Sequence, residues 1–354
     1  MTTPTQLEIV DLRHFTARQM RPLLEQESEA WQRRLRWNYR SSTELLLQYL
    51  DSRILPGFVA LDRGRICGYT FCVYEGHKAV IGDIYVSAEQ PMRLAVTQSL
   101  ARHLMEVLEA SPDTDRIEAQ LLLFEAGELA PAFDRSDFTV FPRLFLERNL
   151  ELEASSAIAF PPEIELCRWA SSGYDSAAEL IHAAYVGHID SEINDQYRTL
   201  HGSLRFLHNI VRFPGCGMFD PESSWVLRER RSGAMIALLL CSRVAHDVAH
   251  VTQLCVAPAF RGGRLGELLL RHCMERLPAQ RYAALTLTVS EANASALRLY
   301  NTAGFTTRHR FDALVLDKTI HPNRFRLGLE AYSDVVSRAD VLPVSSKRAK
   351  PPGR

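Results

Sequence analysis

The chain reads VAPAFRGGRLG from Val256 to Gly266 and NASALRLYNTAGF from Asn293 to Phe305, and these two stretches decide the fold. The first stretch is typical of an apolar strand, a Gly/Arg loop and a helix that begins near Leu265. Such a loop presents unpaired N–H groups and the positive end of a helix dipole at one point, which favours a phosphate. The second stretch predicts another helix, with an Asn early, a Tyr late and a glycine that ends it.

The two stretches together resemble the acyl-CoA-binding motifs of the GNAT superfamily of N-acyltransferases. The family's loop reads Arg/Gln-x-x-Gly-x-Gly/Ala, and the matching residues here are Arg261, Arg264 and Gly266, with an arginine at the middle glycine. The resemblance covers residues 165–318. It implies an α/β fold with a mixed, mostly antiparallel sheet that opens where two neighbouring strands diverge.

Hydrophobic periodicity predicts the elements of this region. Helices are expected near residues 176–185, 203–210, 265–277 and 292–302, and strands near 224–228, 235–244, 250–256, 284–289 and 311–316.

The composition limits the classes of protein to which this chain can belong. A chain of 354 residues has room for two domains, and its hydrophobic content of 46% and charged content of 23% describe a globular protein. The formal net charge of −1 gives no reason to expect a nucleic-acid partner. No apolar run approaches the roughly 20 residues that span a bilayer, and the N-terminus lacks the pattern of a signal peptide. We therefore expect a cytoplasmic protein with no membrane partner.

The seven cysteines are scattered and form no Cys-x-x-Cys pair. Most lie in apolar strand or helix patterns, which predicts buried, reduced thiols and no metal site.

The first half of the chain repeats the second. Phe58 aligns with Trp225 at an offset of 167 residues, Ile84 with Leu254 at 170, and Phe133 with Tyr300 at 167. The nearly constant offset predicts an internal duplication. We expect a degenerate GNAT-like domain over residues 1–150, a linker over 151–164, a catalytic GNAT domain over 165–320 and a C-terminal extension over 321–354, disordered from about 337. This tandem arrangement resembles that of mycothiol synthases.

The first copy lacks the chemical groups of the second. Residues 87–95 read SAEQPMRLA where the Arg-Gly-Gly loop would stand, Phe133 replaces Tyr300, and Asp137 replaces Gly304. A site without a phosphate cradle or a proton donor does not support the same chemistry. We therefore expect the first domain to serve packing and to shape the acceptor cleft.

The resemblance implies a site that binds acetyl-CoA as a co-substrate. The loop N–H groups and the guanidiniums of Arg261 and Arg264 would hold the pyrophosphate, and the pantetheine arm would lie beside the strand at Leu254. Asn293 matches a cofactor-contacting Asn of the family, although it could equally be a helix N-cap. The predicted cofactor-binding residues are Leu254, Cys255, Val256, Arg261, Gly262, Gly263, Arg264, Leu265, Gly266, Asn293 and Tyr300.

Three residues are predicted to act on the reacting groups. The Leu254 N–H would polarise the thioester carbonyl, and Tyr300 would protonate the leaving thiolate, unless it is merely a packed aromatic. His250, at the position of the family's strand base, would accept the amine proton, because an imidazole has an ordinary pKa near 6.5. The competing bases are His246, Asp247 and Glu192, and the alternative for His250 is a surface strand histidine.

The acceptor pocket is expected from residues 185–197 and 213–225, and the acids and aromatics of the first segment suit a cationic amine. The predicted function is transfer of an acyl group other than an aminoacyl group, in practice acetyl, to a primary amine of a small molecule or peptide. The alternatives are a non-catalytic acyl-CoA-binding regulatory or scaffolding protein, and a tandem transferase that takes aminoacyl groups from tRNA. The choice between monomer and homodimer stays open.

Overall fold

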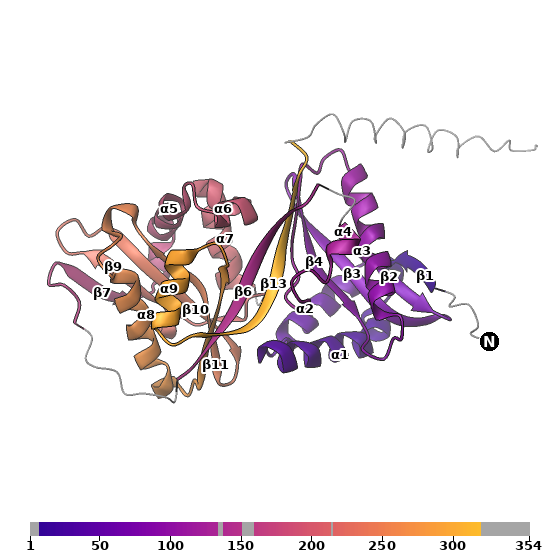
Figure 1. Ribbon diagram of the computed structural model, residues 1–354, viewed down its shortest axis with the longest axis horizontal. Helices are drawn as coiled ribbons and strands as arrows, with labels where there is room; N and C mark the ends of the chain where they lie inside the picture. Colours follow the sequence, from indigo (N-terminus) through magenta and orange to yellow (C-terminus); the bar gives the residue numbers. More distant parts are fainter. Residues whose placement is uncertain (1–6, 134–136, 151–158, 214, 320–354) are drawn as a thin grey trace, which may run out of the picture.

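The structure, a computed structural model, describes residues 7–133, 137–150, 159–213 and 215–319. Two lobes lie side by side, and two long strands run between them (Figure 1). We call residues 7–150 the first half of the chain and residues 159–319 the second half. The predicted C-terminal extension and most of the predicted linker lie outside the described residues.

The first half begins with a short strand and two helices that cover one face of its sheet. Helix α1 starts with a capping box, in which Thr16 and Gln19 each accept a hydrogen bond from the other's backbone N–H. The elements are β1 (Leu7–Asp11), α1 (Ala17–Leu35), α2 (Arg40–Asp51), β2 (Gly57–Asp62), β3 (Arg65–Glu75), β4 (Lys78–Val86), α3 (Arg93–Ala110), β5 (Arg116–Gln120), α4 (Ala130–Phe133) and β6 (Thr139–Asn149).

The second half repeats this order, with the short strand β8 added before β9. Its elements are β7 (Ile164–Arg168), α5 (Tyr174–Tyr185), α6 (Asp190–Ile193), the 3-10 helix η3 (Asp195–Arg198), α7 (Leu200–Arg212), β8 (Met218–Phe219), β9 (Trp225–Glu229), β10 (Met235–Ala245), β11 (Val248–Val256), α8 (Leu265–Arg276), β12 (Ala284–Ser290), α9 (Ala294–Thr302) and β13 (Thr306–Asp317). The helices and strands predicted from periodicity coincide with α5, α7, α8, α9 and β9–β13, with shifts at their ends.

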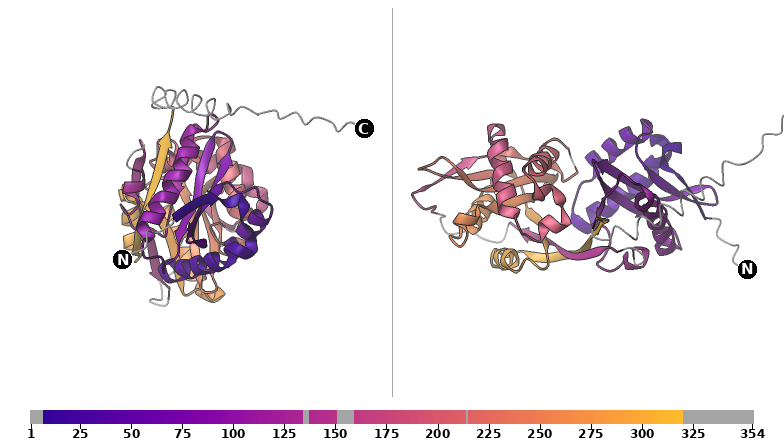
Figure 2. Two further views of the ribbon diagram at one scale, coloured as in Figure 1. Left: turned by 90° about the vertical axis from the view of Figure 1, so that its right-hand side faces the viewer. Right: turned by 90° about the horizontal axis from the view of Figure 1, so that it is seen from above.

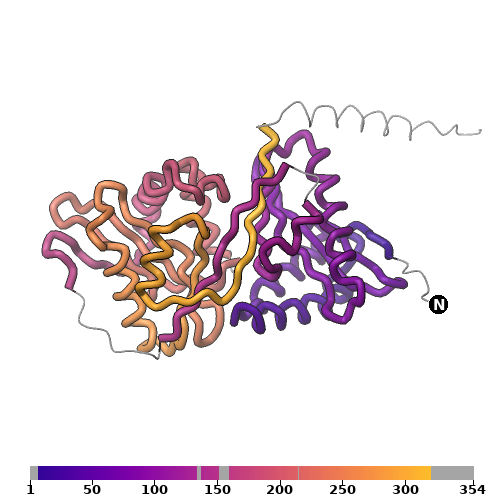
Figure 3. Tube along the Cα trace, viewed as in Figure 1, coloured from indigo at the N-terminus to yellow at the C-terminus, as the bar shows by residue number. Residues whose placement is uncertain are grey.

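All the main strands form one sheet because the two halves exchange their last strands. The order is β1-β2-β3-β4-β5-β13-β6-β12-β11-β10-β9-β7, with β8 beside β10. Strand β6 of the first half pairs with β12, and β13 of the second half pairs with β5. Figures 2 and 3 show these two strands passing between the lobes. The predicted boundary near residues 151–164 therefore describes the sequence repeat, whereas the sheet does not divide there.

Each half contains a pair of parallel strands that diverge. Strands β11 and β12 pair only from Val248↔Ala284 to Val251↔Leu287, although both continue beyond. Strands β4 and β5 pair in the same way, and β4 and β11 each carry a register irregularity at the point of divergence. Divergence exposes part of the edge of β11 inside the sheet.

The second half buries apolar side chains on both faces of its sheet. Leu269, Leu270 and Cys273 of α8 pack with Leu285 on one face, and Ile181 of α5 packs with side chains of α7 and β10 on the other. Among the described residues, no helix combines the length and apolarity needed to cross a membrane. Within the same part of the chain, no cluster of His, Cys, Asp and Glu side chains has a metal-binding arrangement.

Candidate active site

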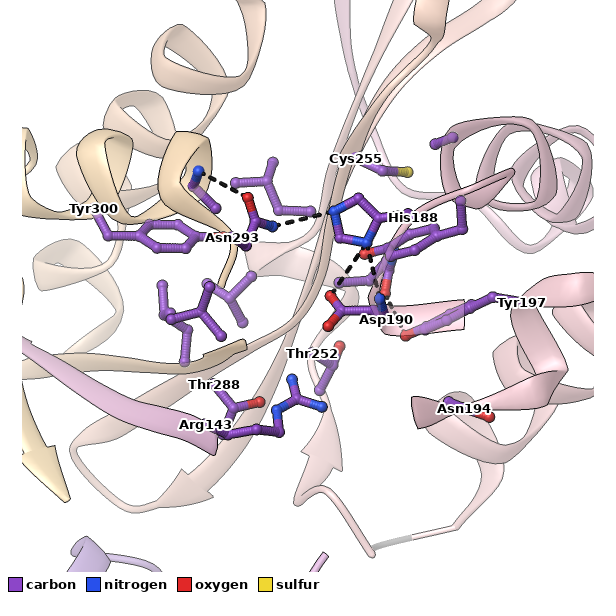
Figure 4. Close-up of a pocket in the computed structure, with 18 of the residues that line it drawn as sticks. Arg143, His188, Asp190, Asn194, Tyr197, Thr252, Cys255, Thr288, Asn293 and Tyr300 are labelled. Carbon is purple, nitrogen blue, oxygen red and sulfur yellow. Dashed lines mark hydrogen bonds and ion pairs between the residues drawn. The ribbon is translucent and has the colours of Figure 1, made fainter. Parts of the chain in front are cut away.

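A cavity of about 380 Å³ lies where β11 and β12 diverge. Figure 4 shows Tyr300 and Asn293 on one side of the separated strands, and His188, Asp190, Asn194 and Tyr197 on the other. The cavity is lined by residues from α5, α6, α9, β11 and β12, and also by Gln120 and Arg143 from the first half. It thus combines residues that are far apart in the sequence.

The free edge of β11 forms one wall of this cavity. Ala257 N donates to Ile236 O of the neighbouring chain segment, and Leu238 lies opposite Cys255 in the register. Because antiparallel strands alternate their hydrogen-bonded residues, the N–H of Cys255 faces β10, whereas those of Leu254 and Val256 face the opening. The predicted carbonyl-polarising group, the Leu254 N–H, is therefore directed toward the cavity.

The Gly/Arg loop leads from β11 into α8 with two residues in left-handed backbone conformation, Gly262 at φ 83° and Arg264 at φ 59°. No side chain caps α8, and its first intrahelical bond runs from Leu268 N to Arg264 O. The preceding N–H groups of the first turn thus remain available to an anion, aided by the helix dipole.

The two arginines of the loop are engaged within the protein. Arg264 forms a bidentate pair with Glu267, at 2.9 Å and 2.8 Å, and its side chain is exposed. Arg261 lines the cavity and donates to Ala184 O at the end of α5. Both guanidiniums thus already have partners within the protein, so we expect the backbone N–H groups of the loop to contribute most to anion binding.

Tyr300 of α9 lines the cavity and is 8% exposed. Its ring packs edge-on against Phe305, with 5.8 Å between centroids. Burial, and secondarily the charge of Asp190, raises the pKa of Tyr300 above its ordinary value. The hydroxyl is thus protonated at neutral pH, as a proton donor must be.

His250 also reaches the cavity, but it is buried rather than on the surface. Its ring lies against those of Trp37 and Phe145, with centroids 5.0 Å and 5.8 Å away, and its Nδ1 is 2.9 Å from Thr286 Oγ1. Burial lowers the pKa of His250 to about 3. The imidazole is therefore neutral at pH 7 but a much weaker base than its ordinary pKa implies.

The competing bases lie elsewhere. Asp247 pairs with Arg36, His246 is exposed beside it, and Glu192 pairs with Arg198 at 2.7 Å. None of the three competitors is among the described residues that line the cavity.

The burial of His250 predicts a pH dependence of stability. As the pH falls, the unfolded chain takes up the proton near pH 6.5, whereas the folded chain does so only near pH 3. The free energy of unfolding therefore falls as the pH falls from 6.5 toward 3. Between pH 7 and pH 5 this loss is about 2 kcal/mol. Urea unfolding should show a smaller loss over this interval in His250→Gln. The exposed His246→Gln should match wild type, and equal losses in all three proteins would refute this assignment.

His188 and Asp190 belong to a polar cluster that faces the cavity. The sequence predicts them only as part of the acceptor segment 185–197. Asn293 caps α9 through its Oδ1, which accepts from Ala296 N, and its Nδ2 lies 3.2 Å from His188 Nε2. His188 Nδ1 lies 3.7 Å from Asp190 Oδ2, and the Ser290 hydroxyl donates to Asp190. Asn293 thus serves as an N-cap and also positions a cavity residue.

Two tyrosines and a glutamine line the side of the cavity beside α5 and η3. Tyr185 and Tyr197 stack with centroids 4.1 Å apart. Gln253 joins them, since the Tyr197 hydroxyl donates to its Oε1 at 3.2 Å and its Nε2 donates to Tyr185 at 3.0 Å. Burial raises the pKa of both tyrosines, so this wall is uncharged. From the predicted segment 213–225, Cys216 lines the cavity.

The first half holds the segment that carries Asp190 and Tyr197. Lys78 of β4 is buried and contacts Glu118 of β5 at 3.1 Å and Asp195 of η3 at 2.6 Å. Asp195 N also donates to Glu118 Oε1 at 3.2 Å, and Arg116 donates to Glu192 O. This buried ionic network joins the two halves directly behind the cavity.

The corresponding region of the first half has a different chemistry. Residues 87–92 connect β4 to α3 without a residue in the left-handed conformation. Phe133 is buried at the position aligned with Tyr300. On the adjoining strands, the Tyr69 hydroxyl donates to the buried Glu27 at 2.6 Å, and burial raises the pKa of Glu27 and of Asp83.

Comparison with known proteins agrees with this arrangement. Residues 188–305 match the Acetyltransferase (GNAT) family. The fold is similar to that of a GCN5-related N-acetyltransferase from Sphaerobacter thermophilus, at 15% identity and a TM-score of 0.61 over 89% of this chain and 97% of that one. It is also similar to a tandem GNAT protein of the clavulanic acid biosynthesis pathway, at 16% identity and a TM-score of 0.57 over 88% and 98% of the two chains.

A third similar structure is the glucosamine N-acetyltransferase region of a fungal multi-domain β-N-acetylglucosaminidase. It is 15% identical with a TM-score of 0.60, over 89% of this chain and 38% of that one. No curated protein sequence matches the chain. The second half therefore contains a GNAT acetyltransferase domain, and the chain as a whole has the fold of tandem GNAT proteins, as predicted.

Proposed function

We propose that the second half transfers an acetyl group from acetyl-CoA to a primary amine bound in the cavity between β11 and β12. The observation that carries this proposal is a cavity that combines free N–H groups of β11 with the buried hydroxyl of Tyr300, together with the uncapped start of α8, which follows β11 through the loop whose Arg261 lines that cavity. The N–H groups of β11 suit the thioester carbonyl, the start of α8 suits the phosphates of CoA, and the Tyr300 hydroxyl suits the leaving sulfur.

Each group at the site has a separate role in the proposed reaction. Acetyl-CoA supplies the activated acyl group. The first turn of α8 binds phosphate, and the Leu254 N–H donates a hydrogen bond to the carbonyl oxygen while the amine nitrogen bonds to the carbonyl carbon. Tyr300 then gives its proton to the sulfur as the carbon–sulfur bond breaks, a transfer between groups of high pKa.

The amine must also lose a proton. Asp190 is our preferred group for binding the ammonium, because its carboxylate lines the cavity and has no Arg or Lys partner among the described residues. His250 remains a candidate base, but its pKa of about 3 makes it the weaker one. A pH profile of kcat/KM in Asp190→Asn and His250→Gln would separate the two, because only removal of the base abolishes the acidic limb.

We expect one acetyl-CoA site per chain, because the loop with Gly262 and Arg264 in left-handed conformation occurs in the second half and not at residues 87–92. Calorimetric titration should give a stoichiometry near one. Two sites of equal affinity would contradict the proposed asymmetry between the halves.

The activity is tested by release of free CoA with a panel of small amines and peptides. Amine-dependent release is expected. Tight CoA binding without release on any amine would overturn the proposal in favour of a non-catalytic acyl-CoA-binding protein.

A further inference from the structure

A guanidinium of the first half, that of Arg143, faces the cavity. Arg143 lies on the exchanged strand β6, opposite Ser290 of β12, and lines the cavity. Its Nη1 donates to Gln120 Oε1 at 3.0 Å, whereas its Nε is buried and has no hydrogen-bond partner. Among the described residues, no carboxylate forms an ion pair with it. Figure 4 shows its guanidinium directed into the space below Asp190.

The carboxylate of Asp190 faces the same space. The Asp190 side chain is 15% exposed, accepts a hydrogen bond from Ser290 and lies 3.7 Å from a nitrogen of His188. No Arg or Lys of the described chain pairs with it. A partly buried charge is stabilised by a partner of opposite sign, and among the described residues Asp190 has no Arg or Lys partner and Arg143 has no carboxylate partner.

The two charges share one cavity and yet do not neutralise each other. Both act on Tyr197, whose pKa the charge of Asp190 raises and that of Arg143 lowers, while burial raises it most. No Asp190–Arg143 contact falls within ion-pair distance in the described structure. Opposite charges kept apart across a binding cavity are matched by a ligand that carries both charges itself.

We propose that the amine acceptor is a small amino acid-like molecule, with a primary amine held by Asp190 and a carboxylate held by Arg143 and the Gln120 amide. This inference rests on the proposed function. A guanidinium fits a carboxylate with two parallel hydrogen bonds, and the otherwise unpartnered Nε completes that fork. The other guanidinium of the cavity lining, that of Arg261, is bound to Ala184 O, so a singly charged anion suits the site better than a phosphate.

The test compares each amino acid with its own carboxamide, which differs only in charge. CoA release from the full chain should give a kcat/KM roughly 10- to 100-fold higher for the carboxylate, the effect of one charge-assisted pair. Arg143→Gln should abolish this preference by raising KM for the carboxylate, and should leave the carboxamide nearly unchanged. Arg143→Lys should keep part of it, and Arg310→Gln, a surface arginine outside the cavity, should behave as wild type.

Several results would overturn the inference. Equal kcat/KM for carboxylate and carboxamide in wild type would do so, as would equal losses for both in Arg143→Gln when that variant binds acetyl-CoA normally. If no amine releases CoA, the proposed function fails, and calorimetry with the amino acid in the presence of CoA then decides the inference separately. Binding that is lost in Arg143→Gln supports it, and absence of binding to wild type refutes it.

Discussion

Tyr300→Phe should lower kcat by roughly 100- to 10,000-fold, the usual cost of losing a general acid. The substitution removes one hydroxyl and leaves the packing against Phe305 in place, so stability should hardly change. The Michaelis constant for acetyl-CoA should also hold, because binding of the phosphates is assigned to the loop and the start of α8 and not to this hydroxyl. Steady-state kinetics of CoA release at saturating amine would measure the loss.

The matched control is Tyr49→Phe, because Tyr49 is 38% exposed and lies outside the cavity. It should keep wild-type kinetics. Full activity of Tyr300→Phe would mean that water or another side chain delivers the proton, and the role assigned to Tyr300 would be wrong.

Lys78→Met should destabilise the protein by about 3–5 kcal/mol, as expected when one partner of a buried ionic network is removed. The side chain of Lys78 is 5% exposed, and its loss leaves Glu118 and Asp195 without their common cation. Because Asp195 adjoins the segment that carries Asp190 and Tyr197, KM for the amine should rise more than KM for acetyl-CoA. Urea unfolding and steady-state kinetics measure the two effects.

Arg21→Met provides the comparison. Arg21 pairs with Glu44 on the surface, with side chains 45% and 59% exposed, so its loss should change the free energy of unfolding far less than the loss of Lys78 does. If Lys78→Met were no more destabilising than this variant, the network would not hold the halves together.

Local sequence patterns were sufficient for the parts of the site that lie on one strand–loop–helix unit. The loop from Gly262, the helix that carries Tyr300 and the strand edge at Leu254 depend on nearby residues. The structure places Leu254 and Tyr300 in one cavity, which the loop reaches through Arg261. The role of each in catalysis remains a prediction.

Other parts of the site depend on contacts between distant residues. Arg143 reaches the cavity only because β6 crosses into the second half, and no local pattern indicates that exchange. His250 was predicted to be the base, with the ordinary pKa of an imidazole, but Trp37 and Phe145, both from the first half, bury it and lower its pKa. Neither the strand exchange nor the burial of His250 can be predicted from one segment of the sequence alone.

The exchange of β6 and β13 has a consequence for how such a chain can evolve. After a duplication, a copy that has lost its own activity is normally free to decay or to be deleted. Here deletion of the first half would strip β12 and β13 of their common neighbour and leave both with exposed edges. It would also remove Arg143 and Gln120 from the cavity of the surviving copy. Selection on the half that carries the cavity thus also acts on the other half, and the two can be inherited only together.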